Sequence, residues 1–96
     1  MKLYIVNQEN YEELAYNFGA CVNLGIYTNK ETALNVMIEN IYKDVNENYI
    51  LDKESDIEKY KKDFLGSIRL FYSYQNNYDY RREYCVEFWD VELSIT

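Results

Sequence analysis

The sequence lacks several residue types on which common biochemical functions depend. Its 96 residues include no histidine, and its three glycines are isolated from one another at Gly19, Gly25 and Gly66. Histidine is the usual general base near neutral pH, so its absence argues against most acid–base and nucleophilic catalysis. Isolated glycines cannot form the glycine-rich loop that cradles a phosphate. We therefore predict a protein that is not an enzyme and that needs no cofactor.

Paired thiols and long apolar runs are also missing. Cys21 and Cys85 are far apart and form no CxxC arrangement. We therefore expect two buried free thiols rather than a disulfide. The opening apolar run, Leu3–Val6, is too short for a signal peptide, and no run approaches the length of a membrane span. These features predict a cytoplasmic protein that does not contact a membrane.

Cations are scarce, whereas carboxylates and tyrosines are abundant. There are 10 Lys and Arg against 17 Asp and Glu, which gives a net charge of −7, and there are 12 tyrosines. Binding to nucleic acid or anionic lipid requires Lys and Arg to neutralise phosphate, so the charge argues against both partners. Arginines and tyrosines between Arg69 and Arg82 could form a base-stacking platform, but a cross-strand aromatic ladder explains them without a ligand. The charge favours a basic protein as the partner.

The stretch Gly25–Val45 organises the predicted fold. Thr28 and Glu31 have the spacing of a capping box, in which each side chain accepts a hydrogen bond from the other's backbone N–H. An apolar stripe with helical spacing follows, made up of Ala33, Leu34, Met37, Ile38, Ile41 and Val45. Such a stripe must pack on another element, and a sheet is the natural partner. Asn35, Glu39, Lys43 and Asp44 fall away from the stripe and are expected to face water.

The rest of the chain predicts one α+β domain spanning residues 1–96. A second capping box (Ser55, Glu58) begins a helix that Gly66 ends. Residues 10–18 could form a short helix or an irregular loop. We expect four strands, Leu3–Val6, Ala20–Tyr27, Ile68–Gln75 and Tyr80–Leu93, in an antiparallel sheet of order 2-1-4-3 with both helices on one face. The side-chain phase changes along the last strand, so we predict a bulge near Phe88 and Trp89 that turns both apolar sets to the core.

The interhelix segment Asp44–Ser55 is similar to an EF-hand calcium loop. Its oxygen-bearing side chains fall at four of the expected places: Asp44, Asn46, Asn48 and Asp52. However, Tyr49 replaces the glycine that the sharp turn needs, and Ser55 replaces the bidentate glutamate that closes the coordination shell. We therefore predict no metal site, and we keep a weak calcium or small-ligand site here only as an alternative.

Acidic residues are the remaining candidates for function. They gather between Glu47 and Glu58, and again along the last strand from Glu83 to Glu92. A solvated surface explains both groups, but carboxylates beside tyrosine anchors also suit a face that binds a basic groove on another protein. The predicted partner-binding residues are Glu47, Tyr49, Asp52, Glu54, Asp56, Tyr78 and Tyr80. The alternative is a homodimer in which the exposed edge of the second or third strand pairs across a two-fold axis.

Three segments carry a resemblance to known proteins: Leu3–Val6, Gly25–Ala33 and Tyr84–Leu93. Together they resemble a group of small phage and bacterial α+β proteins with the pattern "Y-x-V … G-[VI]-[FY]-[ST]-x-x-x-A" and a closing aromatic–acidic strand. That group has no assigned activity. In size, acidity and lack of a catalytic motif the chain is also similar to phage-encoded inhibitors of host defence, including anti-CRISPR proteins. The resemblance implies an inhibitor of a nucleic-acid-handling host protein, and at its extreme a DNA mimic.

Overall fold

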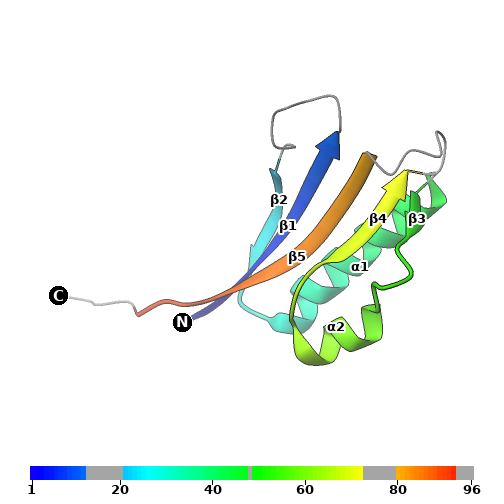
Figure 1. Ribbon diagram of the computed structural model, residues 1–96. Coiled ribbons are helices and arrows are strands. Elements are labelled where there is room, and N and C mark those ends of the chain that lie inside the picture. The colour runs from blue at the N-terminus through cyan, green and yellow to red at the C-terminus, as the bar shows by residue number, and fades with distance from the viewer. Residues whose placement is uncertain (13–20, 48, 73–79, 93–96) are drawn as a thin grey trace.

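The protein is an α+β fold in which a five-stranded antiparallel sheet carries a long helix across one face (Figure 1). The computed structural model describes residues 1–12, 21–47, 49–72 and 80–92. Its elements in chain order are β1 (Lys2–Glu12), β2 (Cys21–Tyr27), α1 (Lys30–Asn46), β3 (Tyr49–Leu51), α2 (Ile57–Asp63), β4 (Ile68–Tyr72) and β5 (Tyr80–Asp90). The predicted α+β class is confirmed.

The strand order is β2-β1-β5-β4-β3. The predicted number of four strands is wrong, whereas the four predicted strands keep their relative order of 2-1-4-3 and a fifth strand is added beyond the last of them. The extra strand is β3, which we had expected to be part of an interhelix loop. It pairs with β4 from Tyr49↔Tyr72 to Leu51↔Leu70 and covers the edge that β4 would otherwise expose. The last strand pairs with the first, because β5 lies between β1 and β4.

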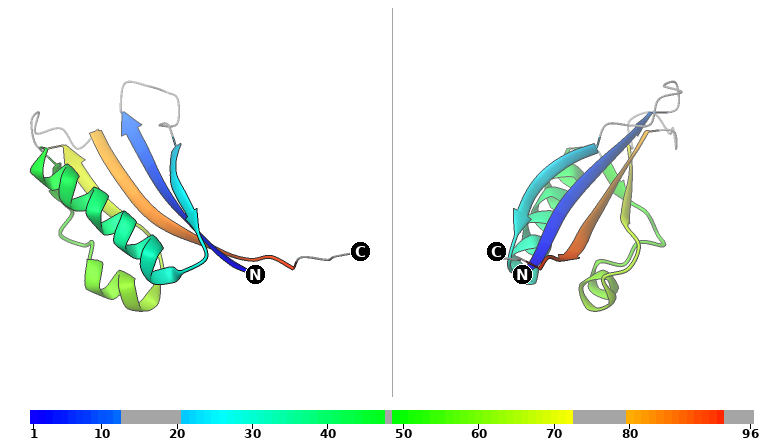
Figure 2. Two further views of the ribbon diagram at one scale, coloured as in Figure 1. Left: turned by 180° about the vertical axis from the view of Figure 1, so that it is seen from behind. Right: turned by 90° about the vertical axis from the view of Figure 1, so that its left-hand side faces the viewer.

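Helix α1 lies across one face of the sheet, as seen from behind in Figure 2. Most of its predicted apolar stripe packs into the core there. Met37 is 0% exposed and Ile41 is 1% exposed, which confirms them as core residues. Two members of the pattern behave differently. Val45 is 43% exposed, whereas Asp44, which we had expected to face water, is only 4% exposed.

Both helix caps differ from the predicted capping boxes by one residue. The N-cap of α1 is Asn29 rather than Thr28, and its side-chain oxygen accepts from the backbone N–H groups of Glu31 (2.8 Å) and Thr32 (3.2 Å). Asparagine and aspartate are at least as good as threonine in this role, because their oxygen reaches the free N–H groups of the first turn.

Helix α2 shows the same shift at its start and ends earlier than predicted. Asp56 caps it by accepting from the Lys59 N–H at 3.1 Å, while the Ser55 hydroxyl instead accepts from the Arg69 N–H of β4 at 2.9 Å. The helix ends at Asp63, followed by Phe64 in the left-handed region (φ 58°), so Gly66 does not end it.

Tyr60 of α2 completes the edge of β5 where β4 no longer covers it. Strand β4 pairs with β5 only as far as Ile68↔Tyr84. Two residues further on, the Tyr60 hydroxyl accepts the Val86 N–H at 2.8 Å, and the Tyr60 ring is 3% exposed. A side chain therefore replaces a strand partner for this backbone group.

The bulge predicted at Phe88 and Trp89 is absent, because β1 and β5 pair without interruption from Lys2↔Asp90 to Glu12↔Tyr80. The register shift lies instead between β1 and β2, where Leu24 is the extra residue beside Gly25 (φ 139°). Gly25 adopts the positive φ beside the bulge, a conformation that glycine tolerates.

The long register of β1 also changes two other expectations. Residues 10–12 belong to β1, so no helix begins at Asn10, and residues 13–18 lie outside the described part of the chain. Because strand residues alternate between faces, the unbroken pairing leaves Trp89 on the sheet face opposite α1.

The two thiols are free, as expected, but neither is buried: Cys21 is exposed and Cys85 is half-buried. In the described ranges, no helix is both long enough and apolar enough to cross a membrane.

Candidate protein-binding edge

The segment between α1 and α2 places the predicted acidic residues along one margin of the molecule, beside the edge strand β3 (Figure 1). Glu47 is the C-cap of α1, Asp52 follows β3, and Glu54 and Asp56 precede α2. We call Glu47, Asp52, Glu54 and Asp56 the acidic edge. Of the three tyrosines predicted to join them, Tyr49 lies in β3, Tyr78 lies outside the described residues, and Tyr80 begins β5 with its side chain likewise outside them.

The part of the acidic edge that follows β3, from Asp52 onward, is an ordered turn that is attached to β4. The Asp52 N–H donates to the Arg69 carbonyl at 2.9 Å, and the Asp52 carbonyl accepts the Ser55 N–H at 3.0 Å. The Asp52 carboxylate also accepts the Glu54 N–H at 3.3 Å. The Arg69 guanidinium lies 3.4 Å from Asp52 and 3.6 Å from Glu54. These contacts fix the backbone from which the carboxylates project.

The four carboxylates divide into two that support the edge and two that face solvent. Asp52 is 17% exposed and pairs with Arg69, and Asp56 is engaged in capping α2. Glu54 is 82% exposed and Glu47 is exposed at the end of α1. An exposed ion pair such as Arg69–Glu54 contributes little, so Glu54 remains available to a partner.

Tyr49 supports the edge instead of serving as an exposed anchor. Its ring is half-buried beneath the Arg82 guanidinium, whose central carbon lies 4.5 Å from the ring centroid. It also packs edge-on against Tyr72, with centroids 5.3 Å apart. The prediction that Tyr49 presents itself to a partner is therefore not supported by its packing.

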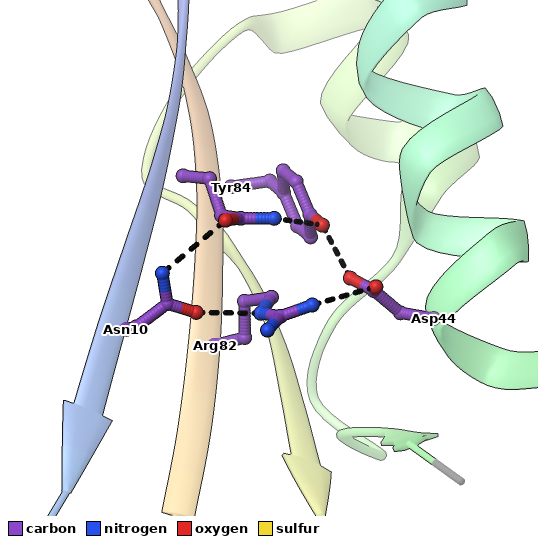
Figure 3. Close-up of polar contacts among 5 residues, drawn as sticks. Asn10, Asp44, Arg82 and Tyr84 are labelled. Atoms are coloured by element: carbon purple, nitrogen blue, oxygen red, sulfur yellow. Dashed lines mark hydrogen bonds and ion pairs between the residues drawn. The ribbon is translucent and has the colours of Figure 1, made fainter. Parts of the chain in front are cut away.

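A closed circuit of hydrogen bonds lies beneath this margin and joins α1 to β1 and β5 (Figure 3). We call it the polar ring; its members are Gln8, Asn10, Asp44, Arg82 and Tyr84. The Asp44 carboxylate accepts from Arg82 Nη1 at 2.7 Å and from the Tyr84 hydroxyl. The ring closes through Gln8 Nε2 to the Tyr84 oxygen (2.7 Å), Asn10 Nδ2 to Gln8 Oε1 (3.2 Å) and Arg82 Nε to Asn10 Oδ1 (2.6 Å).

Every polar group of the ring that faces the interior is satisfied, which is what makes a buried carboxylate tolerable. Among the described residues, no buried side-chain nitrogen or oxygen lacks a hydrogen-bond partner. Burial and the hydrogen bond to Asp44 raise the pKa of Tyr84 above its usual value of 10, so the phenol stays protonated and donates to the carboxylate. The ring thereby fastens the C-terminal half of α1, and the acidic edge that follows it, onto the sheet.

The polar ring was not predicted, because Asp44 was expected on the solvent side of the helix. Met37, Ile41 and Asp44 are spaced by four and three residues, which places all three on the same helix face. A charged residue at the end of a core stripe is a signal that it has a buried partner.

The calcium-loop alternative does not match the observed structure. Asp44 lies within α1 and pairs with Arg82, while residues 49–51 form a strand, so the required continuous loop is not present. Across the ranges that the structure describes, no group of three or more Cys, Asp or Glu side chains could hold a metal ion.

A cavity of about 280 Å³ adjoins the acidic edge. Its lining combines the charged side chains of Glu54, Asp56 and Lys59 with the apolar surfaces of Tyr60 and Ile68. Such a lining suits a long cationic side chain, whose stem contacts apolar surface while its head meets carboxylates.

Comparison of the chain with protein-family models, with curated proteins and with solved structures gives no match.

Proposed function

We propose that the protein is a non-enzymatic, acidic interaction protein that binds a basic groove on another protein and blocks it. The observation that carries this proposal is the acidic edge, where Glu54 faces solvent from a turn tied to β4 and Glu47 faces solvent from the C-cap of α1. Between residues 47 and 58 the sequence has five carboxylates and one lysine. The edge therefore presents concentrated negative charge on a preformed scaffold, which suits electrostatic steering toward a cationic surface.

The partner that fits best is a nucleic-acid-handling protein of a host defence system. Its groove is basic because it binds phosphate, so carboxylates held in a fixed array can occupy the same groove and exclude the nucleic acid. The resemblance to small phage proteins and to anti-CRISPR inhibitors supports this choice of partner and favours action in the host cytoplasm. At its extreme, the carboxylates act as a DNA mimic, with no direct contact to nucleic acid.

An interference assay tests this proposal in cells. The chain would be expressed in bacteria that carry an active CRISPR–Cas system, and transformation by a targeted plasmid would be counted. We expect expression to restore transformation. An affinity capture from the same lysate would identify the bound effector, and its binding should weaken as salt rises because the steering charges are screened.

The structure indicates which charges to reverse. Glu47→Lys with Glu54→Lys changes the exposed part of the acidic edge while leaving the Asp52–Arg69 pair and the Asp56 cap intact. The matched control, Glu39→Lys with Glu92→Lys, makes the same charge change at two other exposed positions. Loss of inhibition with the first pair alone supports the edge. Equal activity of both variants would remove the edge from the mechanism.

A homodimeric structural or regulatory module is the second candidate. The observation that favours it is the position of β2 at one margin of the sheet, where its outer edge has no strand partner among the described residues. Strand β4 cannot serve this role because β3 pairs with it. Light scattering at high concentration tests this candidate, and a strictly monomeric mass would eliminate it.

A further inference from the structure

An apolar patch lies on the face of the sheet opposite α1. Leu3 pairs with Trp89 across β1 and β5, and Ile5 pairs with Ile26 across β1 and β2. Directly opposed residues share a face and lie within contact distance, so these four side chains are neighbours. We call Leu3, Ile5, Ile26 and Trp89 the Trp89 patch. Val6 follows Ile5 in β1, so its side chain points to the opposite face, where it is 0% exposed beneath α1. The patch therefore lies on the face away from α1.

The Trp89 patch is open to solvent. Trp89 is 54% exposed and Ile26 is 58% exposed, while Leu3 and Ile5 are half-buried between them. Both helices contribute to the core on the other face, through Met37 of α1 and Tyr60 of α2. A single exposed apolar side chain is ordinary, but a contiguous group centred on tryptophan is typical of an interface.

The indole of Trp89 is held in place before any partner arrives. Its Nε1–H donates to the Glu87 carboxylate at 3.1 Å, which restrains the side chain. Glu87 pairs with Ile5, so this carboxylate also lies beside the patch. An anchor whose rotamer is already restrained loses less entropy on binding.

The charges on this face define the partner. Three carboxylates lie on the same face of the sheet as the patch, those of Glu9, Glu83 and Glu87. Glu9 pairs directly with Glu83 across β1 and β5. The one arginine of β5 with this phase, Arg81, is already engaged, 3.5 Å from Glu83 and 4.4 Å above the Tyr11 ring. Arg69 of β4 lies on this face as well, opposite Glu83, and it pairs with Asp52 and Glu54. The face therefore carries an excess of carboxylates, of which Glu87 adjoins the apolar patch.

This charge distribution argues against a second copy of the chain as the occupant. Each chain carries a net charge of −7, and two patches brought together would also bring together their Glu87 carboxylates. Like charges at an interface oppose association, whereas a positively charged partner gains from the same field.

We propose that the Trp89 patch docks an amphipathic protein segment that carries aliphatic side chains flanked by Lys or Arg. The aliphatic side chains cover Leu3, Ile5 and Ile26. A cation of the segment lies over the indole face and beside the Glu87 carboxylate, which combines a cation–π contact with an ion pair. This surface lies on the opposite face of the sheet from α1 and does not depend on the acidic edge or on the proposed defence partner.

A peptide titration tests the proposal on the intact chain. The probe is a helical peptide of about 14 residues with Leu on one face and Lys on the other, and two matched peptides replace Leu by Ser or Lys by Glu. Trp89 is the only tryptophan, so its indole N–H gives a single reporter signal in an NMR spectrum of the ¹⁵N-labelled chain. We expect the Leu/Lys peptide to shift that signal and the amides of Leu3, Ile5 and Ile26, and the two matched peptides to leave them in place.

Three variants locate the contact. Trp89→Ala should weaken binding by about tenfold or more, and Glu87→Gln by about threefold, with a smaller loss at high salt. The matched control is Phe88→Ala. Phe88 is 48% exposed on the same strand, but its side chain lies on the sheet face that α1 covers. Binding to the Phe88 variant should equal that of the unaltered chain.

Several outcomes would overturn the proposal. These are unchanged Trp89 signals, shifts confined to Glu47 and Glu54, an equal loss with Phe88→Ala and Trp89→Ala, and equal binding of the Leu/Lys and Ser/Lys peptides. Concentration-dependent shifts of the patch without peptide would show that a second copy is the occupant and would also contradict it. An inactive acidic edge in the interference assay would leave this result unaffected.

Discussion

The two faces of the sheet are built from the same strands but differ in how much of their side-chain surface is exposed to solvent. On the covered face, Val6, Leu70 and Tyr84 are fully buried together with Met37 of α1. On the open face, Ile26 and Trp89 remain more than half exposed. Both faces contain apolar side chains and carboxylates, so composition does not distinguish them.

The difference lies in whether the carboxylates have buried partners. On the covered face, Asp44 is enclosed by Arg82 and Tyr84, and the polar ring lets the helix close over it. On the open face, Glu87 is exposed and bonds only to the neighbouring indole among the contacts of the described chain. A sheet face whose charged groups are paired within the protein can be covered by a helix. A face whose charged groups are unpaired must remain exposed to solvent or bind another molecule.

The largest expected effect comes from placing a charge beneath α1. Met37→Asp should reduce the free energy of unfolding by about 4 kcal/mol or more, because it creates a cavity and buries an unpaired carboxylate. Ile26→Asp on the open face should cost less than about 1 kcal/mol. Urea unfolding followed by circular dichroism measures both, and similar losses would show that the two faces are equally buried.

Breaking the polar ring should have the next largest effect. Asp44→Ala leaves the Arg82 guanidinium without its buried partner and should cost about 3 kcal/mol. Glu39→Ala, at an exposed position on the same helix, should change the stability by less than about 0.5 kcal/mol. If thermal melting gives the same midpoint for both variants, the ring does not hold the helix.

Alkaline titration compares two adjacent residues of β5 that point to opposite faces. Burial, with nearby Glu9 and Glu87, raises the pKa of Cys85 from 9.0 to about 11, and burial raises the pKa of Tyr84 above 10. Each group is neutral when protonated, and the folded state holds its proton more tightly. The free energy of unfolding should therefore have its full value below pH 9 and fall as pH rises past 9 for Cys85 and past 10 for Tyr84.

Two variants assign these contributions. Under reducing conditions, Cys85→Ser should flatten the loss of stability between pH 9 and about 11, and Tyr84→Phe should flatten it only above pH 10. Urea unfolding at fixed pH steps gives the slopes. Unaltered slopes in both variants would mean that neither group titrates differently on folding.

The smallest expected effects concern the caps of the two helices that close the covered face. Asn29→Ala and Asp56→Ala should each cost about 1 kcal/mol, because each removes an acceptor for free N–H groups of a first turn. Thr28→Ala should cost less than about 0.3 kcal/mol, since Asn29 performs this role. If Thr28→Ala lowers the free energy of unfolding more than Asn29→Ala does, Thr28 is the N-cap and the predicted capping box is correct.

Local patterns were sufficient to predict α1 and its core face. The spacing of Met37 and Ile41 and the polar cluster at residues 28–31 locate the helix to within two residues of its observed start. The pairing of the last strand with the first also followed from short connections and antiparallel geometry. These features depend on residues that are close in sequence or on the order of the elements, and both can be read from the sequence pattern.

The candidate surfaces could be predicted only in part. The acidic edge was visible as a run of carboxylates, but the division between supporting Asp52 and exposed Glu54 depends on Arg69, which is distant in sequence. Trp89 was mispredicted as a core residue, because the change of side-chain direction along β5 suggested a bulge. The register with β1 shows no such bulge, and register is a property of two strands together.

The sequence by itself determined the class of fold, the helix that covers the sheet and the negative charge of the surface, because each arises from residue type and short-range spacing. The tertiary structure alone decided that residues 49–51 pair as a strand, that Asp44 is buried and that Trp89 is exposed. Each of these outcomes depends on which distant group lies opposite a residue. The free energy of burying a polar side chain depends more on whether a distant group hydrogen-bonds to it than on the polarity of the side chain itself.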